Sequence, residues 1–130
     1  MDLITLKHQH GKAFEITVRR HSLVSDMHPD DGGEDAGPNP TELFAASMAA
    51  CIGMIAADYC RHHGLPASGI ELSVVAQLAD HPKRVQSITI DLELPEGFPE
   101  NRKQAIINAA KTCVIYNSLT HPPEIDLEIV

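Results

Sequence analysis

The sequence predicts an α+β domain in which strands accompany one long, buried central helix. Two observations lead to this prediction. Alternating apolar and polar residues, typical of half-buried strands, occur in several short segments of the chain. Between them, residues 43–57 are apolar apart from Ser47 and Gly53. The 130 residues fit one compact domain, 1–130, whose core a partner subunit could usefully complete.

The first 26 residues predict a meander of three strands. The segments "LITLKH", "AFEITVRR" and "HSLVSD" alternate apolar and polar positions, and Gly11 lies between the first two. Residues 27–38, "MHPDDGGEDAGP", are rich in Gly, Pro and Asp and have no periodicity. They therefore predict a loop, which could cover a site.

Residues 40–63 carry the signals of a long helix. Asn39 can cap its N-terminus, Pro40 suits the first helical position, and Glu42 completes a capping box. The apolar stretch of about fifteen residues is shorter than the roughly twenty that a membrane span needs, so no membrane contact is expected. A helix that is apolar on every side must be enclosed by protein. A single small sheet cannot supply this, so we expect a second subunit and a homo-oligomer.

The remaining segments complete the α+β pattern. "GIELSVVAQLAD" and "RVQSITIDLEL" flank the turn "HPK" and predict a hairpin with one buried face. "PENRKQAIINAAKTCVIYNSLTH" predicts a second helix with Cys113 near its middle, and "PPEIDLEIV" predicts a last strand.

Composition excludes some functions. A formal net charge of −8, with no Trp and few other aromatic residues, argues against nucleic acid. The N-terminus lacks the pattern of a secretory signal, so a cytoplasmic location is expected. His8 and His10 would share one face of a strand, but two ligands do not make a zinc site. We expect neither a metal nor a cofactor.

Three cysteines at wide spacing are unlike a secreted disulfide framework. Cys51 and Cys60 lie nine residues apart on one predicted helix, about 13.5 Å in rise, so they cannot form a disulfide with each other. Cys51 and Cys113 lie on different predicted helices, and nothing local prevents their meeting. The alternative is that all three are small buried hydrophobic residues, which is the commonest role of free cysteine.

The segments "GPNPTELFAASMAACIG" and "KTCVIYNSL" resemble the two signature regions of the OsmC/Ohr family, osmotically inducible protein C and organic hydroperoxide resistance protein, and the chain is most similar to its OsmC-like branch. The resemblance implies an intertwined homodimer with antiparallel sheets wrapped around the central helix. It also implies a thiol peroxidase of the oxidative stress response. Cys51 would reduce an organic hydroperoxide and become a sulfenic acid, and Cys113 would resolve it to a disulfide that a dithiol or lipoyl-type reductant reopens.

The peroxidases of this family also use a Glu and an Arg to activate the thiol. Thr41 stands where they have the Glu, and Glu42 follows one residue later, as in the OsmC-like branch. The loop of residues 27–38 contains no arginine, which leaves Arg19 and Arg20 on the preceding strands as candidates. Two functions therefore remain open: the peroxidase, or an OsmC-like dimer that binds a small apolar ligand at the subunit interface without peroxidase activity.

Overall fold

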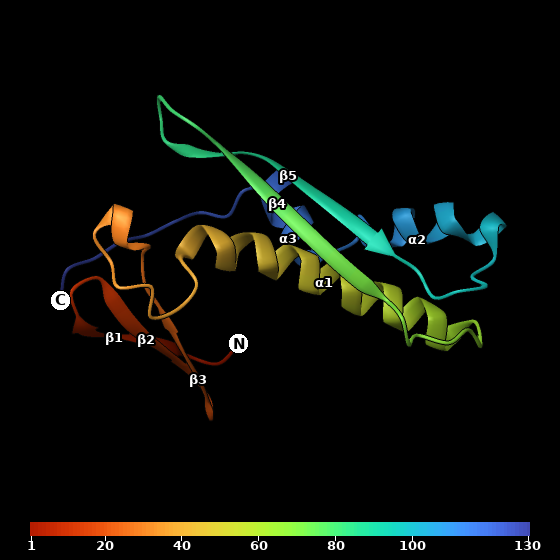
Figure 1. Ribbon diagram of the computed structural model, residues 1–130, viewed down its shortest axis with the longest axis horizontal. Helices are drawn as coiled ribbons and strands as arrows, with labels where there is room; N and C mark the ends of the chain where they lie inside the picture. The colour runs from red at the N-terminus through yellow and green to blue at the C-terminus, as the bar shows by residue number, and fades with distance from the viewer. The chain divides into compact units, whose positions relative to one another are not determined.

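The computed structural model describes residues 1–130 and has the predicted α+β composition, with two antiparallel sheets and three α-helices. The chain forms two compact units, residues 1–44 and residues 45–130. Figure 1 labels the elements in chain order. The first unit holds a three-stranded sheet and the loop after it, and the second holds a hairpin and the shorter helices. The helix α1 begins in the first unit and continues through the second.

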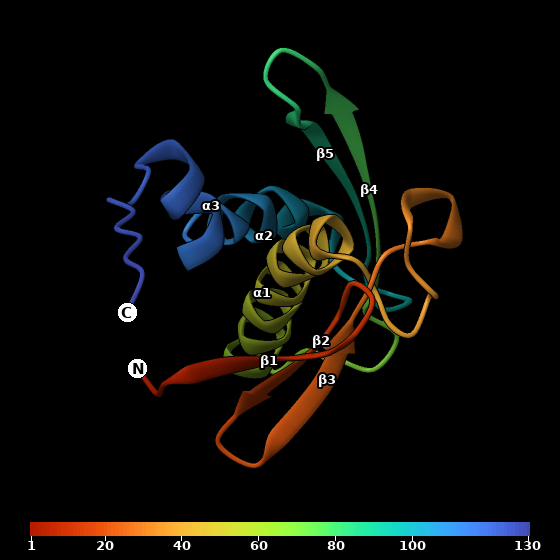
Figure 2. The same ribbon diagram turned by 90° about the vertical axis from the view of Figure 1, so that its left-hand side faces the viewer.

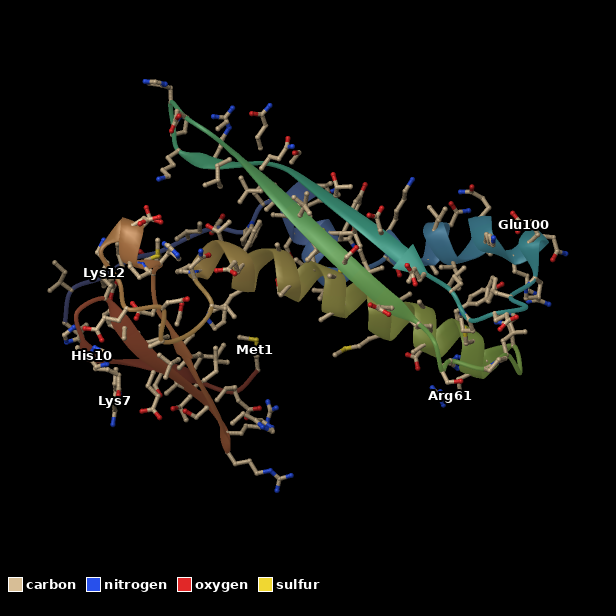
Figure 3. The ribbon with its side chains drawn as sticks, in the orientation of Figure 1. Met1, Lys7, His10, Lys12, Arg61 and Glu100 are labelled. Carbon is tan, nitrogen blue, oxygen red and sulfur yellow. The ribbon has the colours of Figure 1, made fainter.

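The sheet of the first unit is the predicted meander. Its strands are β1 (Ile4–His10), β2 (Ala13–Val18) and β3 (His21–Ser25). They pair in the order β1-β2-β3, so that Leu6, Ile16 and Leu23 lie side by side across the sheet. Every residue of β1 is exposed, and one edge of this strand has no partner. Figure 3 labels Lys7, His10 and Lys12 on the β1–β2 hairpin.

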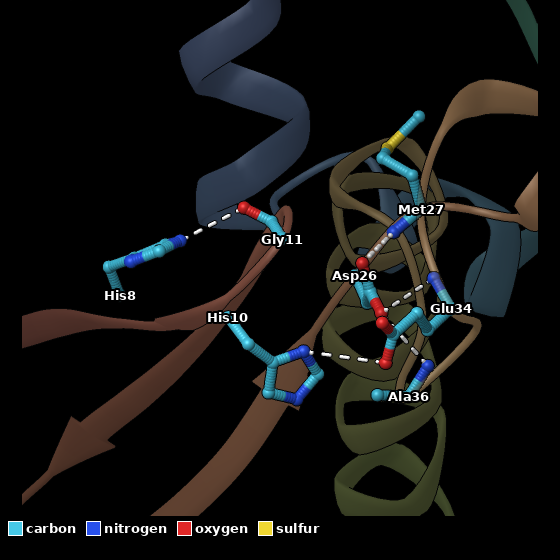
Figure 4. Close-up of polar contacts among 7 residues, drawn as sticks. All are labelled: His8, His10, Gly11, Asp26, Met27, Glu34 and Ala36. Atoms are coloured by element: carbon cyan, nitrogen blue, oxygen red, sulfur yellow. Dashed lines mark hydrogen bonds and ion pairs between the residues drawn. The ribbon is translucent and has the colours of Figure 1, made fainter.

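Asp26 organises the predicted loop, which contains the 3₁₀ turn η1 (Pro29–Asp31). Its side chain is buried with 2% exposure and accepts hydrogen bonds from the backbone N–H groups of Met27, Glu34 and Ala36 at 2.7, 3.1 and 3.2 Å (Figure 4). The N–H of Met27, with those of Ala36 and Glu34, lowers the pKa of this carboxyl against an opposing effect of burial. One ionised side chain therefore satisfies three backbone donors of a loop that has no regular structure to pair them.

Two further contacts tether this loop to the β1–β2 hairpin. The His10 imidazole lies 3.4 Å from the Glu34 carboxylate, and Lys12 Nζ donates a hydrogen bond of 2.6 Å to the backbone oxygen of Asp31. Gly33 packs so closely that a Cβ there would overlap the backbone of Met27. The loop is thus held at several points within the first unit.

The helix α1 (Pro40–His62) has the predicted capping box. The Glu42 N–H donates to Asn39 Oδ1 at 2.8 Å, and the Asn39 N–H donates to Glu42 Oε1 at 3.0 Å. By length and composition this helix could cross a membrane, because an 18-residue window of it reaches a mean hydropathy of 1.6. Within the chain 22% of that window is buried. The sequence argument, that the apolar stretch is too short to span a membrane, therefore does not hold for the whole helix.

The second unit contains the predicted hairpin, β4 (Glu71–Ala79) and β5 (Arg84–Glu93). Half-buried and exposed residues alternate along both strands, which confirms that one face is covered and the other faces water. The hairpin packs on α1 at Gly53, where a Cβ would come within 3.0 Å of Leu72 Cδ1. A glycine at this point of the helix therefore lets helix and strand approach closely.

The prediction of one continuous second helix was wrong. The segment forms the 3₁₀ turn η2 (Glu100–Arg102), then α2 (Lys103–Ala110) and α3 (Val114–Thr120). Cys113 is the N-cap of α3 rather than a mid-helix residue. The break has a local cause, because the Thr112 hydroxyl donates to the backbone oxygen of Ala109 at 2.6 Å and the Cys113 sulfur accepts from the next turn. Both short helices lie alongside the part of α1 in the second unit (Figure 2).

The prediction of a last strand was also wrong for the single chain. Residues 122–130 form no strand, and the side chains of Ile125, Leu127 and Ile129 are 89, 90 and 101% exposed. The alternating pattern of the sequence is present, but no strand of the same chain pairs with this segment. A strand needs a neighbour for its backbone N–H and C=O groups, and pattern alone does not supply one.

Asp26→Asn should lower the melting temperature at pH 7, because the amide nitrogen cannot accept the hydrogen bonds that the second carboxylate oxygen holds. The pKa of Asp26 lies below its ordinary value of 3.8, so its contribution to the free energy of unfolding is complete above that value. It is lost as the pH falls through the folded-state pKa. Thermal unfolding followed by circular dichroism from pH 7 to pH 2 should therefore show the two proteins converging at low pH. Asp30→Asn, at a side chain 89% exposed, is the control, and a constant difference between Asp26→Asn and wild type at all pH values would contradict the assignment.

Candidate functional site

The structure brings together the two cysteines that the family resemblance pairs, Cys51 and Cys113. Cys51 lies near the middle of α1 and is half-buried, whereas Cys113 lies between α2 and α3 and has no exposed surface. Cys51 is one of the groups that raise the pKa of Cys113, so the two thiols are neighbours, and both are free. The pair lies entirely within the second unit, so its geometry does not depend on how the two units are arranged.

Backbone groups of the helix break position Cys113. Its Sγ accepts a hydrogen bond from the N–H of Tyr116 at 3.5 Å, which caps the first turn of α3. Its own N–H donates to the backbone oxygen of Ala110 at 3.1 Å, and its carbonyl accepts from the N–H of Asn117 at 2.9 Å. The thiol is thus fixed by the end of one helix and the start of the next, which leaves it little freedom to turn away from Cys51.

The surroundings of Cys113 make it harder to ionise than an ordinary thiol. Burial, the largest influence, raises the pKa of Cys113, and the hydrogen bond to Cys51 raises it further. The backbone N–H groups of Tyr116 and Ile115 oppose these effects without cancelling them. Cys113 is therefore a poor thiolate in this structure, and the thiolate is the nucleophilic form of cysteine. Cys51 is the more exposed of the two sulfurs.

The other predicted site residues lie outside the unit that holds the cysteines. Glu42 is engaged in the capping box of α1. Arg19 lies in the turn between β2 and β3, where its guanidinium is 3.4 Å from the Asp2 carboxylate, and Arg20 is exposed beside it. The groups that act on Cys113 are the Cys51 thiol and the backbone N–H groups of Tyr116 and Ile115. The activating roles of Glu42, Arg19 and Arg20 remain predictions.

Cys60 takes no part in the pair. It is fully buried near the end of α1, as expected for a cysteine that acts as a small hydrophobic residue. Beside it, the Tyr59 ring stacks on His63 at 4.0 Å, and Arg102 donates to the Tyr59 hydroxyl at 3.4 Å. Arg61, labelled at this end of the helix in Figure 3, is paired with Asp58 on the surface. These contacts account for the polar residues here without catalysis.

Residue types alone did not predict the backbone contribution to the site. Tyr116 and Ala110 act through main-chain groups, whose use depends on where the helix breaks. A run of β-branched residues, Thr112, Val114 and Ile115, surrounds Cys113 and lowers helix propensity slightly. That run was the one available hint of the break.

Comparison with known proteins places this geometry in a family. The model of the family described as OsmC-like protein matches residues 32–128, which include both cysteines. No curated protein matches the chain.

Several solved structures have a similar fold. A protein of Psychrobacter arcticus named for the osmotic stress and detoxification response aligns with a TM-score of 0.85 at 22% identity, over 91% of this chain and 88% of that one. The organic hydroperoxide resistance protein OsmC of Legionella pneumophila aligns with a TM-score of 0.65 at 20% identity, over 90% and 88%. OhrB of Bacillus subtilis, an organic hydroperoxide resistance protein, aligns with a TM-score of 0.62 at 21% identity, over 92% of both chains.

At these identities the structural likeness shows a common fold, and the family model adds the sequence relationship. The chain belongs to the OsmC-like protein family.

Proposed function

We propose that this protein is a thiol-dependent peroxidase that reduces organic hydroperoxides in the response to oxidative stress. The observation that carries the proposal is that the free thiols of Cys51 and Cys113, which come from separate parts of the chain, are neighbours. The names of the similar Legionella and Bacillus proteins, both organic hydroperoxide resistance proteins, support it. A cytoplasmic location, where thiols are kept reduced, belongs to the same proposal.

The chemistry needs two thiols and one external reductant. The Cys51 thiolate attacks the terminal oxygen of the hydroperoxide, so that an S–O bond forms, the O–O bond breaks and the alkoxide leaves as the alcohol after taking a proton. The Cys113 sulfur, after losing its proton, then attacks the Cys51 sulfenic acid; the S–S bond forms, the S–O bond breaks and water leaves. A dithiol or lipoyl-type reductant supplies two electrons and two protons to restore both thiols.

The roles of the two cysteines follow from exposure and protonation. Cys51 is half-buried and can be reached by a substrate, whereas Cys113 has no exposed surface. The S–H of Cys113 can stabilise a thiolate on Cys51 by hydrogen bonding, which replaces part of what a neighbouring cation would provide. Cys51 is therefore the peroxidatic thiol and Cys113 the resolving one.

We propose a homodimer as the functional state. In the single chain α1 leaves Met54 69% exposed, and the C-terminal segment exposes Ile125, Leu127 and Ile129 almost completely. Soluble monomers rarely expose large contiguous apolar surfaces. A second copy could cover α1 and offer a strand edge to the C-terminal segment. Such a dimer would also supply the enclosed, apolar surroundings that favour an alkyl hydroperoxide over hydrogen peroxide.

One equivalent of cumene hydroperoxide, added without reductant, should convert the protein to a form with one Cys51–Cys113 disulfide. Cys51 is the cysteine that neighbours Cys113, so it is the expected partner in the disulfide. Peptide mapping by mass spectrometry under non-reducing conditions identifies the bond. In Cys113→Ser the expected product is instead a Cys51 sulfenic acid that dimedone traps. A disulfide that includes Cys60, or dimedone labelling of Cys113 in Cys51→Ser together with none of Cys51 in Cys113→Ser, would contradict the assigned roles.

Catalytic turnover of cumene or tert-butyl hydroperoxide with dihydrolipoamide or dithiothreitol should fall to the background rate in Cys51→Ser, because a serine hydroxyl is scarcely ionised near neutral pH. Coupled consumption of the reductant measures the rate. Cys60→Ala is the matched control on the same helix and should keep the wild-type rate per folded molecule. Turnover that survives Cys51→Ser would refute the mechanism, and absence of turnover in the wild type would favour the non-catalytic, ligand-binding dimer.

Light scattering coupled to size exclusion should give a mass twice the 14.1 kDa of the chain at micromolar concentration, without detergent. Met54→Asp should raise the dimer dissociation constant by at least about a hundredfold, since each of two buried methionines contributes about 1.5–3 kcal/mol. Glu71→Gln, at an exposed position of β4, is the control. A monomeric wild type would contradict the dimer, and a requirement for detergent or lipid would indicate that a membrane covers α1.

A further inference from the structure

An apolar pocket in the second unit has features of a small-molecule site that the peroxidase chemistry does not use. It has a volume of about 180 Å³ and lies between α1, β5, α2 and α3. Its lining residues are Ile52, Ile90, Leu92, Ile107, Ala110, Lys111 and Tyr116. An apolar cavity of about 150 Å³ is enough to hold benzene in another protein, so this volume fits a ring or a short alkyl chain.

Two polar groups at this pocket have no partner within the chain. Lys111 is exposed at the end of α2, and none of the ion pairs of the chain includes it. Tyr116 is half-buried, yet its hydroxyl makes no hydrogen bond and is not sealed from solvent. By contrast, Lys103 on the same helix is paired with Glu100, labelled in Figure 3, at 2.7 Å. An ammonium and a phenol beside apolar walls are complementary to a ligand with a carboxylate at one end and a hydrocarbon at the other.

The pocket shares its walls with the cysteine pair. Tyr116 donates its backbone N–H to the Cys113 sulfur, Ala110 accepts from the Cys113 N–H, and Ile52 follows Cys51 on α1. We propose that the pocket binds a small aliphatic monocarboxylate, with its chain among the isoleucines and its carboxylate at Lys111 and Tyr116. Binding does not depend on the peroxidase activity, because neither Cys51 nor Cys113 lines the pocket.

The test uses hexanoate, hexanol and hexylamine, which share one chain length and differ in charge. Titration of the full-length ¹⁵N-labelled protein at low ionic strength should shift the amide signals of the lining residues. Hexanoate should bind more tightly than hexylamine by about tenfold, with hexanol between them. Lys111→Gln should lower the affinity for hexanoate by about three- to tenfold and leave the affinity for hexanol unchanged. Lys111→Arg should retain the preference for hexanoate over hexylamine. Lys83→Gln, in the β4–β5 turn, is the matched control.

Two pocket variants test the apolar walls. Ile107→Asp changes a side chain that is 48% exposed, and Ala110→Leu fills the space; both should abolish binding of hexanoate and hexanol while circular dichroism shows a folded protein. Cys51→Ser should bind hexanoate like the wild type, so the outcome is independent of turnover. Equal affinity of the wild type for hexanoate and hexylamine would overturn the proposal. So would amide signal shifts on addition of hexanoate that persist in both Ile107→Asp and Ala110→Leu. Absence of binding together with dissociation of a dimer by Ile107→Asp would also overturn it and would assign the pocket to a second copy.

Discussion

The rest of the structure depends on how the apolar surface of α1 is covered. The chain places the β4–β5 hairpin against it at Gly53 and two short helices alongside it, yet buries only a small part of its length. Hydrophobic burial is the main favourable term in folding, so a helix of this composition needs further contacts to be stable in water. The same helix carries Cys51, and a cover that excludes water also sets the polarity around that sulfur. Stability and thiol chemistry therefore have a common origin here.

Burial and main-chain groups set the environment of the cysteine pair. Burial raises the pKa of Cys113, which is fully enclosed, and the neighbouring Cys51 thiol raises it further. The more exposed Cys51 is the sulfur that a substrate can reach. Adjacent main-chain N–H groups orient the enclosed sulfur. This division of roles needs no residue beyond the two cysteines and the ends of two helices.

Sequence patterns predicted the elements whose causes are local. The capping box of Asn39 and Glu42, the meander and the hairpin all follow from residues close together in the chain. The helix break at Cys113 was missed because a sulfur N-cap is uncommon, so the residue type does not indicate one. The segment of residues 122–130 has a strand pattern but forms no strand, because pairing needs an edge that the pattern does not specify. The meeting of Cys51 and Cys113 followed from the family resemblance, since spacing alone only permitted it.

The position of Cys113 at the start of α3 has a thermodynamic consequence. One sulfur atom accepts the Tyr116 N–H and also faces Cys51, so a change of bonding at that sulfur alters its capacity as a hydrogen-bond acceptor. By linkage, whatever free energy the first turn of α3 loses when the sulfur is oxidised must appear in the reduction potential of the pair. Substitutions that stabilise the first turn of α3 unequally in the two redox states therefore shift the potential, even when they do not touch either thiol.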